Sequence, residues 1–160
     1  MVIYMYNGSY LLENKTLRDT EAVINSLSKS DFKSFGKPKN IYYNKVRYDG
    51  NKPIAFVLAE SHNEKGKKVV DLAVAVHPDY RGRGLAYSMA KEAINIIKRD
   101  KNIHMIYWGC EKNNQASISL AKKLGFIHDY DTDQYTIFKM NDKLQPKNES
   151  HSIFNNISLI

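Results

Sequence analysis

The stretch HPDYRGRGLAYSMAKEAI, residues 77–94, places two Arg-Gly pairs between an apolar run and a segment with helical periodicity. The apolar run before it, VVDLAVAV (69–76), is the most continuously hydrophobic segment of the chain and predicts a central strand covered on both faces. Pro78 ends this strand, because proline has no N–H to donate to a sheet ladder. From Leu85 onward, apolar side chains recur at helical spacing and predict a long helix. The chain therefore passes from strand to helix through a glycine-rich basic turn.

The turn RGRG (81–84) has the properties of an anion-binding site. The first N–H groups of a helix lack intrahelical partners, and the helix dipole is positive at this end. Gly82 and Gly84 permit unusual φ angles and let a ligand approach the backbone closely. Arg81 and Arg83 can donate paired hydrogen bonds to phosphate oxygens. These features predict a binding site for a diphosphate group. A tight turn whose arginines only face solvent is the alternative. The spacing matches neither GxxxxGK(S/T) nor GxGxxG, so nucleotide-hydrolysis and dinucleotide motifs are disfavoured.

The composition is that of a globular domain. The chain has 160 residues, with 42% hydrophobic and 26% charged side chains, which favours one domain with its own core. The first residues, MVIYMYNGSYLL, lack the pattern of a signal peptide, and no apolar run approaches the roughly 20 residues that span a bilayer. Cys110 is the single cysteine and cannot form an internal disulfide. We therefore expect a cytoplasmic protein without a membrane segment.

The net charge of +7 suits phosphate ligands, nucleic acids or acidic surfaces, and does not choose among them. The lysines are spread along the chain, as on a solvated basic surface. No aromatic RNA-binding motif of the K/R-G-F/Y type is present, so a nucleic-acid-binding module is the least favoured class. The five histidines show no metal-ligand spacing, and we expect no metal site.

The remaining pattern predicts a mixed α/β (α+β) sheet with one βαβ crossover. Asn114 is expected to cap a second helix that Gly125 ends. A polar turn is expected at 62–68. The other expected elements are a first strand at 2–6 or 10–12, helices at about 19–28 and 31–35, strands at 41–48, 54–61 and 103–110, and a hairpin around 131–133.

Two segments resemble the GNAT superfamily of acyl-CoA-dependent N-acetyltransferases. RGRGLA (81–86) matches the signature Q/R-x-x-G-x-G/A of that superfamily. WGCEKNNQASISLAKKLGF (108–126) is similar to its second conserved segment, N-x-x-A/S-x-x-L-x-x-K-x-G-F. Within the superfamily, this second segment looks most like the zwittermicin A resistance acetyltransferases. The resemblance covers about residues 1–140 and implies one acetyltransferase domain at 1–141. The tail at 142–160 is then disordered, or adds an edge strand or a dimer element.

The resemblance implies a GNAT-like fold: a central, mostly antiparallel mixed sheet flanked by helices, with a splay between strands 69–76 and 103–110. It implies that acetyl-CoA binds along the first of these strands, with its pyrophosphate on the backbone of the signature turn. Asn114 and Ser117 match positions that touch the pantetheine arm, and both also suit the start of a helix. The implied cofactor-binding residues are Val74, Ala75, Val76, Arg81, Gly82, Arg83, Gly84, Leu85, Ala86, Asn114 and Ser117.

The implied reaction is direct attack of a primary amine on acetyl-CoA in a ternary complex, which requires a base for the amine. Asp71 is the only charge inside VVDLAVAV and shares a strand face with the small side chains Ala73 and Ala75. Glu60, late in the neighbouring strand, is the second candidate and could act through water. Either carboxylate could instead have a purely structural role. The acceptor is a small-molecule or peptide amine, and a homodimer is possible.

Ala121 occupies a position where many GNAT enzymes carry the tyrosine that protonates the departing thiolate. This departure supports an alternative function, an acyl-CoA-binding domain with little or no transferase activity. Tyr87, Tyr107, Tyr130, Tyr135 or solvent could supply the proton instead, and the sequence does not choose among them.

Overall fold

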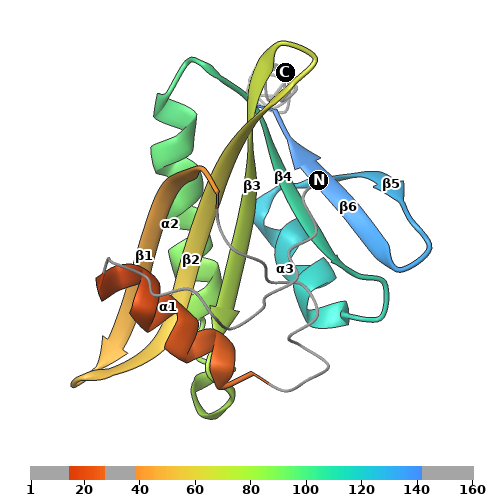
Figure 1. Cartoon of the computed structure of the whole chain (residues 1–160). Coiled ribbons are helices and arrows are strands. Elements are labelled where there is room, and N and C mark those ends of the chain that lie inside the picture. Colours follow the sequence, from red (N-terminus) through yellow and green to blue (C-terminus); the bar gives the residue numbers. More distant parts are fainter. Residues whose placement is uncertain (1–14, 28–38, 142–160) are drawn as a thin grey trace, which may run out of the picture.

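The computed structural model describes residues 15–27 and 39–141, which form a six-stranded sheet flanked by three α-helices (Figure 1). The strand order is β1-β2-β3-β4-β6-β5. Only β3 and β4 run parallel, and α2 connects them, so the predicted mixed sheet and its βαβ crossover are confirmed. The elements are α1 (Lys15–Asn25), β1 (Ile41–Asp49), β2 (Lys52–Glu64), β3 (Lys67–Val76), a 3-10 turn η2 (Pro78–Tyr80), α2 (Leu85–Arg99), β4 (Ile103–Glu111), α3 (Gln115–Leu124), β5 (Ile127–Asp131) and β6 (Tyr135–Met140).

The helices cover both faces of the sheet. In Figure 1, α1 lies in front of β1 and β2, and α2 lies behind the sheet. The larger core lies between the sheet and the helices α2 and α3. A smaller core lies under α1, where Val23 and Ile24 pack with Phe56 and Leu58 of β2. This two-sided cover explains why β2 and β3 are rich in apolar residues.

Side chains of β3 alternate between these two cores. Val70 and Leu72 are almost completely buried in the larger core, toward α2. Asp71 points to the opposite face, and Ala75, further along that face, packs against the core under α1. The alternation follows from the two-residue period of a strand. Asp71 therefore lies on the α1 side of the sheet, away from the large apolar core.

Helix α1 differs from the expected segment 19–28. It begins at Lys15, where an ion pair between Lys15 and Asp19 connects the first two turns at helical spacing. It ends at Asn25, because the N–H groups of Ser26 and Leu27 turn back to the carbonyls three residues earlier, at 3.0 Å each. Its buried side chains are Thr20, Val23 and Ile24, and the apolar periodicity of the sequence did not locate its ends.

The expected polar turn at 62–68 is wrong. Strands β2 and β3 stay paired as far as Glu64 opposite Lys67, so the connection is only Lys65 and Gly66. Both residues have positive φ, 49° and 78°, as two-residue hairpin turns of type I′ require. The polar residues on either side are strand residues that extend beyond the core.

Other local predictions are confirmed. Asn114 caps α3 with its side chain, and Gly125 ends that helix in the left-handed conformation, at φ 93°. The hairpin around 131–133 also forms, and strands β1 and β2 are joined by a two-residue turn at Gly50 and Asn51. The expected first strand, the helix at 31–35 and the tail at 142–160 lie outside the described residues. In the part of the chain that the structure describes, no helix has the length and apolar character to cross a membrane.

Candidate functional site

The central parallel strands separate halfway along their length. β3 and β4 pair at only four positions, which end at Asp71 opposite Tyr107. Beyond this point β3 continues beside β2 as far as Val76, and β4 continues beside β6 as far as Glu111. Figure 1 shows the two strands diverging toward their C-terminal ends. The expected splay is thus present, and we call the space between 72–76 of β3 and 108–111 of β4 the gap.

Backbone groups along the gap are available to a ligand. In this part of β3, including Val74 and Ala75, the ladder to β4 is missing, so every second residue turns its N–H and C=O toward the gap. An extended molecule can bond to such an edge as an added strand would. Val76 differs, because its carbonyl accepts a hydrogen bond from Arg81 Nε at 3.2 Å.

The turn between η2 and α2 stands at the end of β3. Gly82 and Gly84 both have positive φ, 75° and 76°, a backbone conformation that residues with a side chain rarely adopt. A Cβ built at either glycine would meet no other atom within 4 Å, so packing inside the protein does not explain them. Gly84 is the N-cap of α2 and supplies no side-chain hydrogen bond to the first helical N–H groups. The helix therefore begins with exposed donors beneath open space, which suits an anion.

The two arginines of the turn are engaged with the protein itself. Arg81 holds the end of β3 through the Val76 carbonyl. Arg83 donates to the Asp79 carbonyl at 3.1 Å, and its guanidinium lies 4.8 Å from the centre of the Tyr80 ring. These contacts fix the shape of the turn. The backbone N–H groups of residues 81–86 are thus the groups of the turn that could bind an anion, and the arginines add positive charge beside them.

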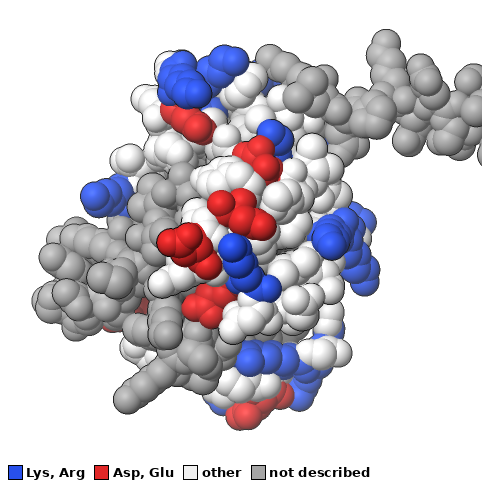
Figure 2. Space-filling view, turned by 90° about the vertical axis from the view of Figure 1, so that its right-hand side faces the viewer, with Lys and Arg blue, Asp and Glu red and all other residues white. Residues whose placement is uncertain are grey.

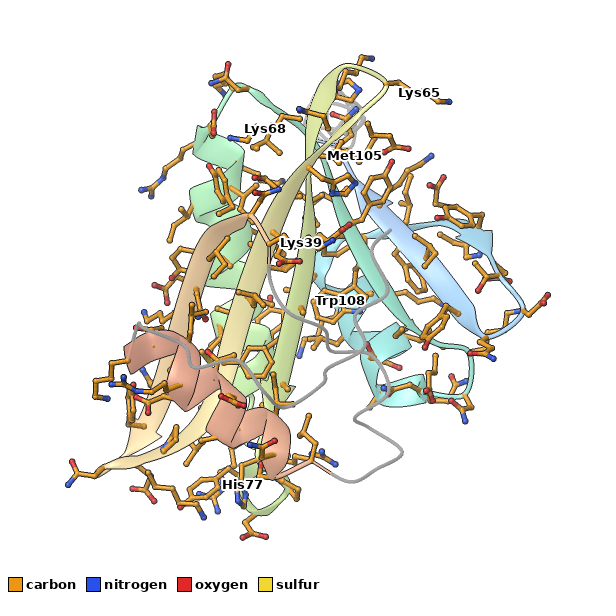
Figure 3. The ribbon with its side chains drawn as sticks, in the orientation of Figure 1. Lys39, Lys65, Lys68, His77, Met105 and Trp108 are labelled. Atoms are coloured by element: carbon orange, nitrogen blue, oxygen red, sulfur yellow. The ribbon has the colours of Figure 1, made fainter. Side chains whose placement is uncertain are left out.

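The opposite side of the gap begins at Trp108 (Figure 3), whose ring is almost completely buried. Its Nε1 donates to Ser117 Oγ at 3.0 Å, and the Ser117 N–H donates to Asn114 Oδ1 at 3.0 Å. Ser117 thereby connects β4 to the start of α3. Burial raises the pKa of the nearby Cys110 thiol, which supports an inert thiol rather than a nucleophile.

Glu60 and Asp71 face each other where the gap begins. They are direct partners in the β2–β3 ladder, so their side chains lie on the same face. Glu60 is only 4% exposed, and its Oε1 accepts a hydrogen bond from the Lys39 backbone N–H at 2.7 Å. Burial raises the pKa of Glu60 to about 7, the Lys39 hydrogen bond opposes this rise, and the Asp71 charge adds to it. A carboxyl with this pKa can exchange a proton near neutral pH.

Sequence reasoning missed the contact of His62 with Asp71, and it named Tyr107 only as a possible proton donor to the thiolate. His62 Nδ1 lies 3.4 Å from Asp71 Oδ2. Tyr107, the rung partner of Asp71 on β4, donates its hydroxyl to Glu64 Oε2 at 3.0 Å, and burial is the main cause of its raised pKa. A usable signal existed, because residues 60, 62 and 64 of one strand must share a face.

The structure thus places Asp71 and the residues 74–76 on β3, Glu60 beside Asp71 on β2, and the turn 81–86 after the end of β3, while Asn114 and Ser117 lie across the gap. Ala121 is completely buried in the larger core, which also contains Trp108 and Phe126. Its position therefore offers no hydroxyl at the gap. Within residues 15–27 and 39–141, no group of three or more His, Cys, Asp or Glu side chains could hold a metal ion.

The chain thus combines a mixed α/β sheet, a separated pair of parallel strands and a helix start that could bind an anion. Residues 9–126 match the family model described as the acetyltransferase (GNAT) family. This match covers more than half of the chain, and the chain belongs to that family. GNAT acetyltransferases use acetyl-CoA as their acyl donor.

Curated relatives carry related names. The chain is 38% identical over 61 residues to the L-amino acid N-acyltransferase MnaT of Escherichia coli, covering 38% of this chain and 35% of that protein. It is 30% identical over 81 residues to the spermidine N(1)-acetyltransferase of E. coli, covering 51% and 42%. An uncharacterized N-acetyltransferase of Methanocaldococcus jannaschii, MJ1207, is 26% identical over 151 residues, with 79% and 64% covered. The chain therefore spans less than two thirds of the length of these relatives.

Solved structures share the fold. An acetyltransferase of the GNAT family from Streptococcus pneumoniae aligns with a TM-score of 0.55 at 17% identity, covering 61% of this chain and 66% of that one. The ribosomal-protein-alanine N-acetyltransferase of Brucella melitensis aligns with a TM-score of 0.53 at 19% identity, covering 60% and 66%. These likenesses show the fold alone. The closer likeness to zwittermicin A resistance acetyltransferases stays a prediction.

Proposed function

We propose that the protein is an N-acetyltransferase that moves an acetyl group from acetyl-CoA to a primary amine by direct attack in a ternary complex. The observation that carries the proposal is the gap between β3 and β4, which starts at the Asp71–Tyr107 rung and lies beside the exposed start of α2. An acyl donor bound along β3 would then have its pyrophosphate on the helix start and its thioester near the two carboxyls.

The donor fits the residues present. The backbone of Arg81, Gly82, Arg83, Gly84, Leu85 and Ala86 would hold the pyrophosphate, since the space above both glycines is open. The strand edge at Val74, Ala75 and Val76 would pair with the pantetheine arm. Asn114 and Ser117 would border the arm from the other side. When bound, acetyl-CoA supplies the thioester that the amine attacks.

The pair Glu60–Asp71 would accept the proton that the amine must lose. An amine is largely protonated at neutral pH and attacks only as the free base. Asp71 lies at the last paired rung before the gap, and Glu60 lies behind it on β2. Two carboxyls on one buried rung favour holding a single proton, because two negative charges there repel each other. When the pair is fully ionised, which the raised pKa of Glu60 allows above about pH 7, it can take up one proton in each reaction cycle.

The acceptor is a primary amine of a small molecule or a peptide. Two relatives are named for an L-amino acid and for spermidine, which makes L-amino acids and polyamines the first acceptors to assay. A homodimer is a further proposal, supported by the exposed side chains Ile41 on edge strand β1 and Ile127 on edge strand β5. The reduced state expected of the buried Cys110 supports a cytoplasmic location.

An acyl-CoA-binding protein without transfer activity is the second candidate function. The buried Ala121 favours it, because a tyrosine hydroxyl that could protonate the thiolate is missing there. A nucleic-acid-binding module is supported less. Over the described residues of the face in Figure 2, basic and acidic side chains are interspersed and form no continuous basic surface.

Calorimetric titration of the protein with acetyl-CoA and with free CoA tests the first step. Assays of CoA release with L-amino acids, spermidine and short peptides test the second. Binding together with turnover of at least one amine supports the transferase. Binding without turnover across the panel favours the second candidate, and the absence of binding to either nucleotide contradicts both.

A further inference from the structure

We infer that His62 is a proton exit for the acceptor site: it takes the proton of the attacking amine from Asp71 and delivers it to solvent. This inference rests on the proposed transferase function and adds a residue to it. His62 touches neither substrate in this scheme and acts through Asp71, so it is a positioning residue.

The geometry forms a short path out of the protein. Glu60 and Asp71 share a rung of the sheet, and His62 Nδ1 lies 3.4 Å from Asp71 Oδ2. Exposure rises along this path. Glu60 is 4% exposed, the Asp71 side chain 13% and the His62 side chain 25%. The imidazole therefore bridges a nearly buried carboxylate and the surface.

The imidazole is suited to this path. Its Nδ1 atom is buried and makes no hydrogen bond to the part of the protein that the structure describes. A nitrogen in that position is available to accept a proton from Asp71, while Nε2 on the other side of the ring can release one. Imidazole is the side chain whose ordinary pKa allows both steps near neutral pH.

The reaction itself requires a proton to leave. A protonated amine and acetyl-CoA give an amide, CoA as a thiol, and one proton. The C–N bond forms as the C–S bond breaks, the thiolate takes up one of the two protons that the ammonium group loses, and the other must reach solvent. Because Glu60 is buried, a bound substrate that fills the gap would leave the carboxyl pair without direct access to water. A side path through His62 returns the pair to its ionised state.

Other titratable groups surround Asp71 on the same side of the sheet. Tyr107 of β4 is its rung partner and donates to Glu64 of β2. Burial raises the pKa of Tyr130 on β5, and nearby carboxylates, Asp71 among them, add to this rise. Lys139 of β6 is paired with Asp129. The phenols keep their protons near neutral pH, and the amino group of Lys139 is held in its ion pair with Asp129, so among these groups the imidazole is the one that can carry a proton onward.

A rescue experiment tests the proton path. Turnover is measured for wild type and His62→Ala at pH 7 in dilute buffer with increasing imidazole, using spermidine or an L-amino acid that the wild type accepts. We expect His62→Ala to lower kcat by about a hundredfold, the lower end for a proton-transfer group. The KM for acetyl-CoA should stay unchanged, and added imidazole should restore kcat. The matched control is His128→Ala, an exposed histidine paired with Asp131 at 3.0 Å on β5. It should neither lose activity nor respond to imidazole.

The outcomes are distinct. An unchanged kcat in His62→Ala overturns the inference, and so does a loss that imidazole does not restore, because that loss indicates a structural role. A second measurement does not depend on finding an acceptor: the NMR signals of the His62 ring between pH 5.5 and 8.5 in wild type, Asp71→Asn and Glu60→Gln. We expect the pH dependence of these signals to differ from wild type in both variants, because His62 Nδ1 lies 3.4 Å from Asp71 Oδ2 and Glu60 shares the rung of Asp71. Identical signals at every pH in all three proteins overturn the inference, whereas a wild type that binds acetyl-CoA but acetylates nothing contradicts only the proposed function.

Discussion

Glu60 and Asp71 occupy one rung of the sheet, and that rung is the last one before β3 separates from β4. The coincidence has a physical consequence. A carboxyl at this position is held by the β2–β3 ladder on one side and borders the gap on the other. Burial and a neighbouring negative charge both favour the protonated form of Glu60. The carboxyl with the raised pKa thus lies on the same rung at which the gap opens.

The first prediction concerns the pH dependence of turnover. Since the pair must be able to accept a proton, kcat should rise as the pH increases through about 7, the value to which burial raises the pKa of Glu60. Glu60→Gln should remove this rise and lower kcat by about a hundredfold. The measurement is a pH–rate profile between pH 5.5 and 8.5 with saturating acetyl-CoA. A variant profile that keeps the wild-type inflection would exclude Glu60 from the proton step.

The second prediction concerns stability. Glu60 has a raised pKa in the folded protein, so its protonated form stabilises the fold below the unfolded value of 4.5, and this stabilisation is lost as the pH rises through about 7. A rise from 4.5 to about 7 corresponds to about 3 kcal/mol. Relative to Glu60→Gln, the wild type should therefore lose up to this amount of unfolding free energy between pH 4.5 and pH 8, measured by urea denaturation.

Glu92→Gln is the control for this stability prediction. Glu92 is exposed, and its hydrogen bond to Lys45 lowers its pKa. Any contribution of Glu92 to the free energy of unfolding therefore has the opposite pH dependence: it is present above pH 4.5 and is lost as the pH falls. If the stability of the wild type relative to Glu60→Gln did not change with pH, that result would contradict a raised pKa of the buried Glu60 carboxyl.

The third prediction separates charge from strain in the turn before α2. Gly84→Glu places a carboxylate where the pyrophosphate would bind, and we expect acetyl-CoA affinity to fall about a hundredfold or more. Gly84→Ala carries the same backbone strain at φ 76°, costs about 1 kcal/mol of stability, and should bind acetyl-CoA much more tightly than the glutamate variant. Calorimetry measures both. Equal affinity of Gly84→Glu and wild type would show that the pyrophosphate binds elsewhere.

How much of the fold could be read from the sequence depends on whether its signals are local. The Asn114 cap, the Gly125 stop and the strand-to-helix turn at Gly84 are encoded within a few residues, and all three formed as expected. The limits of α1 were not encoded in this way. They depend on the Lys15–Asp19 pair and on packing against β1 and β2, where the apolar pattern fades.

The contacts at the candidate site depend on the pairing register of β2 and β3, which the sequence did not predict correctly. A turn at 62–68 would place residue 61 opposite 69, and thus Glu60 opposite Val70. The actual two-residue turn at Lys65 and Gly66 shifts the pairing by one residue, so that Glu60 faces Asp71. Such a slip exchanges the faces of every paired side chain. The contacts of Glu60 with Lys39 and of Asp71 with His62 follow from this register and could not be derived while the turn was misplaced.

The fourth prediction uses Trp108, the only tryptophan of the chain. Ser117→Ala removes the acceptor of its Nε1–H, and an unsatisfied buried donor costs about 1–3 kcal/mol. Urea unfolding followed by Trp108 fluorescence should show this loss. Ser88→Ala is the matched control, because its exposed hydroxyl bonds to the Leu85 carbonyl of its own helix, and it should change stability by less than about 0.5 kcal/mol. Similar stability of Ser117→Ala and wild type would show that the Trp108 contact adds nothing.

The last prediction addresses the missing tyrosine. Ala121 is completely buried in the larger core, so Ala121→Tyr must fit a phenol ring among side chains that already fill the space. Overpacking of this kind typically costs about 1–3 kcal/mol, and we expect the variant to lose stability without gaining turnover. Lys122→Tyr, at the exposed neighbouring position, controls for the loss of helix propensity and should be nearly neutral. Thermal denaturation and CoA-release assays measure both effects. An Ala121→Tyr protein that is as stable as wild type and turns over faster would show that position 121 reaches the gap, and that thiolate protonation limits the native enzyme.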